Sequence, residues 1–93
     1  MAARITARRM SGLGKTHEHI TRLKGYDDVS GQNYDGTREE WYQFVVGGGK
    51  AYVQDDYGRK ADLVARTMPN GTRYVQTRRD GVLTDNLLAL PLY

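Results

Sequence analysis

The stretch SGLGKTHEH, residues 11–19, holds two patterns that are associated with chemistry. Its Gly-Lys-Thr is typical of a phosphate-binding loop, in which glycines let main-chain amides approach a phosphate. Such a loop also needs a glycine about five residues before Gly14, and that position holds Arg9. It further needs a helix directly after the Lys-Thr pair, whereas the following residues include the β-branched Ile20 and Thr21. The stretch therefore predicts a glycine-containing connection and not a nucleotide site.

The second pattern, His-Glu-His, is a candidate metal site. On a β-strand, alternate residues point to the same side, so His17 and His19 can grip one metal ion while Glu18 faces the other way. A protein zinc site needs a further ligand, which the spacing does not identify. The candidates for that ligand are Asp27, Asp28, Asp85 and Tyr93. The alternative is a half-buried histidine that is hydrogen-bonded near the sheet edge, and we expect no bound cofactor.

The segment MPNGT, residues 68–72, is typical of a tight β-hairpin. Pro69 presets the first turn position, and Gly71 is free to take a positive φ. A turn of this kind fixes the register of the flanking strands. The opposed pairs that follow are Met68 and Thr72, Arg66 and Tyr74, Val64 and Gln76, and Asp62 and Arg78. The other side of the hairpin, predicted to face the core, carries Leu63, Ala65, Val75 and Thr77.

The outward side of this hairpin is the candidate binding surface. Arg66 opposite Tyr74, with Arg78 and Arg79 further along, places guanidinium groups beside an aromatic ring. That combination suits stacking on nucleic-acid bases or contact with phosphates. The alternative is a set of ordinary cross-strand pairs, each stabilising by about 0.2 to 1 kcal/mol. Sheet surfaces that bind nucleic acids normally present more than one exposed aromatic side chain.

Composition limits the classes of protein to consider. The chain has 93 residues, which is enough for a single domain over residues 1–93 with one small core. A mean hydropathy of -0.70 indicates that this core lies under many polar loops. The chain has no cysteine, and no apolar run approaches the roughly 18 residues of a membrane span. The basic N-terminal segment is not followed by an apolar stretch, so we expect a cytoplasmic protein.

Charge is unevenly distributed along the chain, although the net charge is only +3. Residues 1–24 carry six Lys or Arg and one Glu, whereas residues 25–62 carry four basic residues and eight carboxylates. Residues 63–93 carry four basic residues and two acids. The two outer segments can attract a polyanion. The interspersed acids make this a weaker signal than nucleic-acid-binding domains usually show.

Hydrophobic periodicity predicts the elements that must position these residues. Strand patterns occur at residues 3–10, 17–25, 50–55, 60–68, 72–79 and 82–90, and residues 26–36 are predicted as a loop. The apolar ending LLALPLY is expected to fold back on the sheet, the alternative being contact with a partner. The expected architecture is α+β: a small, mainly antiparallel sheet of about five strands with one α-helix packed across it.

Helix signals are concentrated after residue 36. Thr37 and Glu40 have the spacing of a capping box, so the helix is predicted to start at Thr37. Trp41, Phe44 and Val45 then form one apolar stripe. The glycines that follow at 47–49 supply a left-handed residue that ends the helix after about ten residues.

Several of these peptides occur together in a known family. The segments ITARRMSG, HEHI at 17–20, TREE, GGGKAYV at 47–53 and TDNLLALP at 84–91 follow one another in the order that this family shows. On these motifs the chain resembles the domain of unknown function 3892 family over most of its length. The resemblance implies a small stand-alone bacterial or phage-associated protein of no established activity, and it supplies no catalytic residues.

These observations favour a small non-enzymatic binding protein that acts on a protein partner. The alternative is a nucleic-acid-binding protein that uses the basic hairpin surface. A metal-dependent enzyme is the third hypothesis, because nothing in the sequence identifies a nucleophile or a complete ligand set. The sequence leaves the partner, the oligomeric state and the pathway open.

Overall fold

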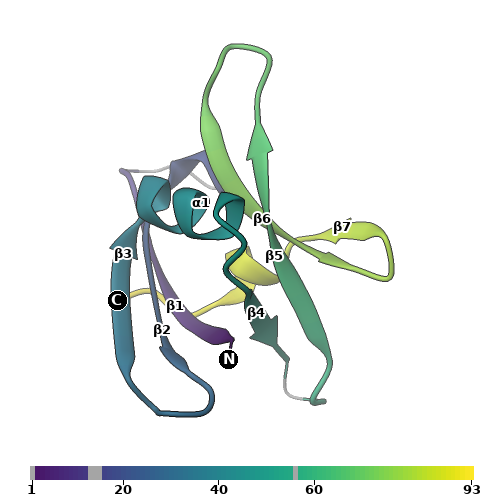
Figure 1. Cartoon of the computed structure of the whole chain (residues 1–93). Helices are drawn as coiled ribbons and strands as arrows, with labels where there is room; N and C mark the ends of the chain where they lie inside the picture. The colour runs from purple at the N-terminus through teal and green to yellow at the C-terminus, as the bar shows by residue number, and fades with distance from the viewer. Residues whose placement is uncertain (1, 13–15, 56) are drawn as a thin grey trace.

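The structure is a computed structural model that describes residues 2–12, 16–55 and 57–93. Its elements in chain order are β1 (Ala3–Met10), η1 (His17–His19), β2 (Ile20–Asp27), β3 (Asn33–Thr37), α1 (Arg38–Val46), β4 (Ala51–Gln54), β5 (Lys60–Thr67), β6 (Arg73–Arg79), β7 (Val82–Thr84) and η2 (Asn86–Ala89). The fold is α+β, with α1 packed against a mixed sheet of seven strands in the order β3-β2-β1-β4-β5-β6-β7 (Figure 1). Neighbouring strands are antiparallel except β1 and β4. Within the described ranges, no helix is long and apolar enough to cross a membrane.

The first strand forms where its alternation predicts it, with every second residue from Ala3 to Ala7 buried. The second strand begins later than predicted, at Ile20, because His17–His19 form a short 3₁₀ turn. In this turn the His19 N–H donates to the Thr16 carbonyl at 3.0 Å, and the Thr16 hydroxyl lies 2.9 Å from His19 Nδ1. Such local hydrogen bonds compete with strand pairing. The prediction of a strand through His17–His19 is therefore wrong.

An edge strand, β3, lies within the stretch predicted as a loop. Asp27 ends β2, and its Oδ1 accepts hydrogen bonds from the N–H groups of Val29 and Ser30, both at 2.9 Å. Gly31 takes a φ of +75°, and the chain then returns to pair with β2 over Asn33–Thr37. The sheet consequently has seven strands and not about five.

The helix follows β3 without a connecting loop, because Thr37 ends β3 and also caps α1. The Thr37 Oγ1 accepts from the Glu40 N–H at 3.2 Å, and Glu40 Oε1 accepts from the Thr37 N–H at 2.9 Å, which confirms the predicted capping box. Trp41 is buried, and its indole N–H donates to the Leu23 carbonyl at 2.9 Å. Phe44 remains 44% exposed, so the predicted apolar stripe is only partly buried.

The β5–β6 hairpin has the predicted register. Arg66 lies opposite Tyr74, and Asp62 lies opposite Arg78. Gly71 takes a φ of +90° in the connecting turn, as its position predicted. The residues predicted to face the core are buried or half-buried: Leu63, Ala65, Val75 and Thr77.

The C-terminal segment folds back on the sheet, as predicted, but little of it is strand. Only Val82–Thr84 form β7, and the chain then turns into η2, which buries Leu87 completely. Residues 90–93, the tail, continue beside β1. The Arg8 N–H donates to the Pro91 carbonyl at 2.9 Å, and the Tyr93 N–H donates to the Arg8 carbonyl at 3.1 Å. The prediction of one strand to residue 90 is wrong, because after β7 the chain turns into η2, and this turn places Leu87 in the core.

The residues that follow β7 occupy the part of the β1 edge that β4 leaves unpaired. β1 pairs with β4 only at Ala3 with Ala51 and at Arg4 with Tyr52, and further along the same edge of β1 the tail takes the place of a strand. Buried apolar side chains from the sheet, α1 and η2 form one core cluster: Ala3, Ile5, Ile20, Leu23, Trp41, Ala51, Val53, Leu63, Val75 and Leu87. The tail is therefore part of the folding unit.

We expect Trp41→Ala to lower the free energy of unfolding by about 3 to 5 kcal/mol, because it removes a large buried ring from a small core. Trp41→Phe should cost less, since it keeps most of the apolar volume and loses the hydrogen bond to Leu23. Urea unfolding followed by far-ultraviolet circular dichroism measures both. Val82→Ala, exposed on β7, is the control and should change the free energy by less than about 0.5 kcal/mol. A Trp41→Ala variant that unfolds at the parental urea concentration would contradict a structural role for this ring.

Candidate functional site

The two histidines of the predicted metal site lie in different surroundings. His17 is buried, with its Nε2 3.9 Å from Asp85 Oδ1 and its ring centroid 6.4 Å from that of Tyr74. His19 is exposed and bonded to Thr16. The strand geometry that would have paired them is replaced by η1. Across residues 2–12, 16–55 and 57–93, no group of three or more His, Cys, Asp or Glu is placed to hold a metal ion.

Three of the candidate third ligands are engaged elsewhere. Asp27 caps the β2–β3 turn, and Asp28 accepts a hydrogen bond from the Tyr52 hydroxyl at 3.2 Å. Tyr93 donates its hydroxyl to Asp35 at 2.7 Å. The remaining candidate, Asp85, lies beside His17.

The hairpin surface brings together three of its four predicted residues. Arg66 and Arg78 are exposed and Tyr74 is half-buried, and the register places all three on the outward side. Arg79 points the opposite way, because successive strand residues alternate between the two faces. Its Nη1 lies 3.9 Å from Asp55 Oδ2. The outward surface therefore keeps two arginines and one tyrosine.

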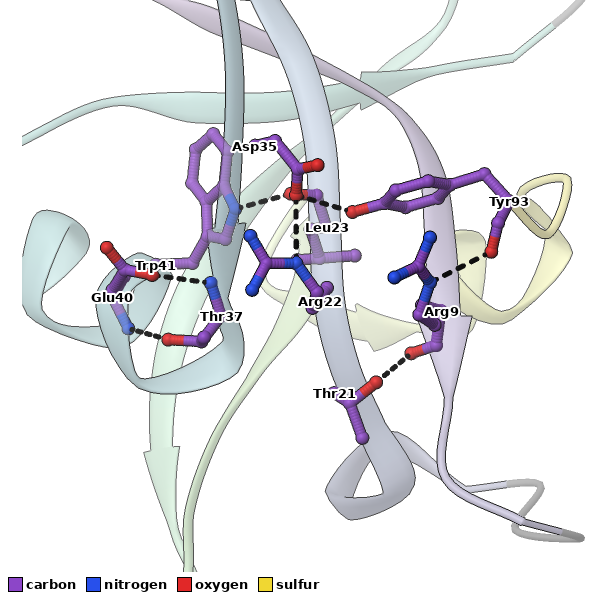
Figure 2. Close-up of polar contacts among 9 residues, drawn as sticks. All are labelled: Arg9, Thr21, Arg22, Leu23, Asp35, Thr37, Glu40, Trp41 and Tyr93. Carbon is purple, nitrogen blue, oxygen red and sulfur yellow. Dashed lines mark hydrogen bonds and ion pairs between the residues drawn. The ribbon is translucent and has the colours of Figure 1, made fainter.

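A polar cluster joins the tail to β1, β2 and β3 (Figure 2). Asp35 Oδ1 accepts from the Tyr93 hydroxyl at 2.7 Å and from Arg22 Nε at 3.1 Å, and Arg9 Nε donates to the Tyr93 main-chain oxygen at 3.0 Å. The cationic groups of Arg9 and Lys24 lie 4.6 and 4.8 Å from the centre of the Tyr93 ring. Burial and the contact with Asp35 raise the pKa of Tyr93. This ring is already in contact with cations of its own chain, which makes it a poor platform for a nucleic-acid base.

A groove that the sequence did not reveal lies between α1 and the β2–β3 hairpin. Its volume is about 580 Å³. The lining comes from the start of β1, the end of β2, the middle of β3, one side of α1 and residues 48–50. Because these segments are far apart in the sequence, no local motif marks the groove.

One wall of this groove is aromatic. The rings of Trp41 and Phe44 meet edge to face, with centroids 5.6 Å apart and an interplanar angle of 79°. Phe44 and Tyr34 are 44% and 41% exposed. A Cβ at Gly49 would lie only 2.6 Å from the Phe44 ring, so the last glycine of GGG leaves the room that this ring occupies. Partly exposed aromatic side chains in a concave site are typical of a binding surface.

Three carboxylates in the groove lining favour their ionised form. Main-chain N–H groups of the β2–β3 turn lower the pKa of Asp27, and the Thr37 N–H lowers that of Glu40. The hydrogen bond from the tail tyrosine is the main cause that lowers the pKa of Asp35. Lys50 is the one cationic residue among the lining residues. At neutral pH the groove therefore combines an aromatic wall with the ionised carboxylates of Asp27 and Glu40, whereas the carboxylate of Asp35 is bonded to Arg22 and Tyr93 on the outward face of β3.

Comparison with known proteins identifies the family. Residues 4–91 match the family model described as Protein of unknown function (DUF3892). This match covers most of the chain, so the chain belongs to that family and the resemblance drawn from its motifs is confirmed. No curated protein and no solved structure matches the chain. The family description assigns no activity, so function has to be inferred from the geometry of the molecule.

We expect zinc or nickel at tens of micromolar to raise the melting temperature by no more than about two degrees, because the described residues assemble no site of three ligands and therefore gain little from the ion. His17 is buried and His19 is exposed, and η1 replaces the strand geometry that would have placed the two side chains on one side. Thermal unfolding with and without metal tests this. A submicromolar dissociation constant in calorimetry that is lost in His19→Ala would show that the pair does bind metal.

We expect acid to weaken the β2–β3 turn through Asp27. Because the folded-state pKa of Asp27 is lowered, its charged form stabilises the fold above the unfolded-state pKa of about 3.9, and this contribution is lost as the pH falls through the lower folded-state value. Asp27→Asn keeps an acceptor oxygen that does not titrate. The stability advantage of the parent over this variant should be largest at neutral pH and should shrink as the pH falls below about 4. Asp62→Asn, on the outward face of β5, serves as the control, and an advantage for the parent that grows in acid would contradict this assignment.

Proposed function

We propose that this member of the DUF3892 family is a non-enzymatic binding protein that holds a segment of a partner protein in the groove between α1 and β3. The observation that carries the proposal is the pairing of half-exposed Phe44 and Tyr34 with carboxylates whose pKa values are lowered. When a partner covers aromatic side chains that a small core leaves exposed in a concave site, the removal of apolar surface from water favours binding. We also propose that it acts in the cytoplasm, and its cysteine-free sequence is compatible with a reducing compartment.

The groove is positioned by rigid elements. Glu40, Trp41 and Phe44 lie on α1, whose N-terminus is fixed by the capping box. Tyr34 lies on β3, which is paired with β2 along its length. A site built on a helix and a strand changes little when a ligand binds, which favours recognition of a defined partner.

Nucleic-acid binding through the outward hairpin surface is the second candidate function. The observation that favours it is the exposure of Arg66 and Arg78 near Tyr74. Two features weaken it: Asp62 lies directly opposite Arg78, and the Tyr74 ring is half-buried. Because of these two features, we expect the protein to bind oligonucleotides only non-specifically, with dissociation constants of about 10⁻⁴ to 10⁻⁶ M at physiological salt.

We expect Phe44→Ala to reduce capture of the natural partner at least tenfold while the protein stays folded, because this ring is exposed and lies at the groove. The measurement is affinity capture from a nuclease-treated native lysate, quantified by mass spectrometry for the parent and the variant. Val82→Ala removes an apolar side chain of β7 that is more exposed than Phe44, and it should leave capture unchanged.

Two results would contradict the proposed function. One is a partner that Phe44→Ala retains as well as the parent does. The other is loss of all captured material on nuclease treatment, combined with loss in Arg78→Ala, which would make the hairpin surface the functional site.

A further inference from the structure

We propose that the partner segment binds as an additional β-strand along the free edge of β3 and that one of its Lys or Arg side chains enters the groove. This inference rests on the proposed function, since it states how the groove is occupied and by what chemistry.

The outer edge of β3 presents main-chain groups for pairing. β3 is the terminal strand of the sheet (Figure 1). The Asp27 N–H donates to the Gln32 carbonyl at 2.8 Å, which fixes the phase of the antiparallel ladder between β2 and β3. Since hydrogen-bonded pairs alternate with non-bonded pairs, Tyr34 bonds to β2 while Asn33 and Asp35 direct their N–H and C=O groups to the free edge.

Thr37, the N-cap residue of α1, agrees with this phase of the β2–β3 ladder. Thr37 belongs to the same alternate set as Asn33 and Asp35, so its N–H also points away from β2. That N–H donates to Glu40 Oε1 at 2.9 Å. Pairing of a partner along this edge therefore ends where α1 begins, and the bonding groups of Asn33 and Asp35 define the register.

The groove follows the main chain of β3. Tyr34, Asp35 and Gly36 all line it, although successive side chains of a strand point to opposite faces. Three consecutive lining residues are explained if the strand edge itself forms part of the wall. Gly36 adds no side chain, and Trp41 closes the space above it, with Nε1 3.3 Å from the position of a Cβ. A strand added at this edge would direct alternate side chains toward the aromatic wall.

The chemistry of the lining selects a cationic side chain. Lys and Arg have an apolar stem and a charged head, which match an aromatic wall that is bordered by carboxylates. Tyr34 and Phe44 offer ring surface to the stem and to the cation. Glu40 is exposed and offers its negative charge directly at the groove, whereas Asp27 is buried, with its Oδ1 bonded to main-chain N–H groups, and adds its negative charge from within the lining. An acidic side chain would be repelled at the same place.

The other edge of the sheet is less suited to strand addition. β7 has three residues, whereas β3 has five. A short edge strand offers few main-chain groups and is one of the usual ways in which proteins prevent unwanted pairing. The strand β3 is longer, contains no proline or lysine, and lies directly beside the groove. These differences make β3 the edge on which a partner strand is held.

The experiment uses a displayed library of random octapeptides selected on the full chain, with Phe44→Ala as the counter-selection. The enriched peptides should share one Lys or Arg within a β-forming stretch. The best peptide is then synthesised and its affinity measured by fluorescence anisotropy. Replacing its basic residue by Ala should weaken binding at least tenfold. N-methylation of one alternate set of its amides should abolish binding, and methylation of the other set should leave binding nearly intact.

The matched variants on the protein are Asn33→Pro and Asn33→Ala. Proline removes the N–H that points to the free edge and leaves the ladder with β2, whereas alanine removes only the side chain. Peptide binding should fall at least tenfold in Asn33→Pro and stay within about twofold in Asn33→Ala. If Asn33→Pro does not fold, the two sets of N-methylated peptides decide the question on the unaltered chain.

Several results would overturn strand addition. Enriched peptides without a basic residue, equal binding of the proline and alanine variants, or equal effects of the two methylated sets would each do so, while dependence on Phe44 would leave the proposed function standing. Failure to enrich any peptide over Phe44→Ala would contradict both. A concentration-dependent dimer in light scattering that is lost in Asn33→Pro would assign the edge to a second copy of the chain.

Discussion

The packing of Trp41 against the β2–β3 hairpin holds the helix to the sheet. Its indole N–H donates to the Leu23 carbonyl at 2.9 Å, and its ring covers Gly36, where a Cβ would lie 3.3 Å from Nε1. At the same place Thr37 ends β3 and caps α1, so the strand and the helix are fixed to each other without a loop. The groove is the space that this arrangement leaves between one side of α1 and the strand.

The tail secures the opposite side of the same strand. Tyr93 donates its hydroxyl to Asp35 at 2.7 Å, and Arg22 contacts the same carboxylate at 3.1 Å (Figure 2). β3 is thus held by Trp41 on the helix side and by Tyr93 on the outward side, and it is the terminal strand of the sheet that the described residues form. This gives a rigid edge beside an aromatic, negatively charged groove, and these are the conditions under which adding a strand from a partner needs little rearrangement.

The sequence allowed features to be predicted where a few neighbouring residues decide them. The turn at 68–72 fixes the hairpin register, and the capping box at Thr37 fixes the start of α1. β3 was missed because Asn, Asp and Gly are depleted in strands, so its pairing depends on the tertiary context that the Asp27 turn and Trp41 supply. The turn at His17–His19 was missed because its local hydrogen bonds outweigh a strand-like pattern. The groove combines segments from the N-terminus to residue 50, so no local pattern predicts it. One local feature points to it: a helix C-terminus needs one glycine, whereas this chain has three in succession, and the last of them, Gly49, leaves room for the Phe44 ring.

Amide chemical shifts in a titration with an arginine-containing strand peptide decide whether a partner strand pairs with β3, because they locate the bound segment on the parent chain. We expect the largest changes on the amides of Asn33 and Asp35 and on the indole N–H of Trp41, with the β5–β6 hairpin unaffected. Changes confined to the amides around Arg66, Tyr74 and Arg78 would contradict it.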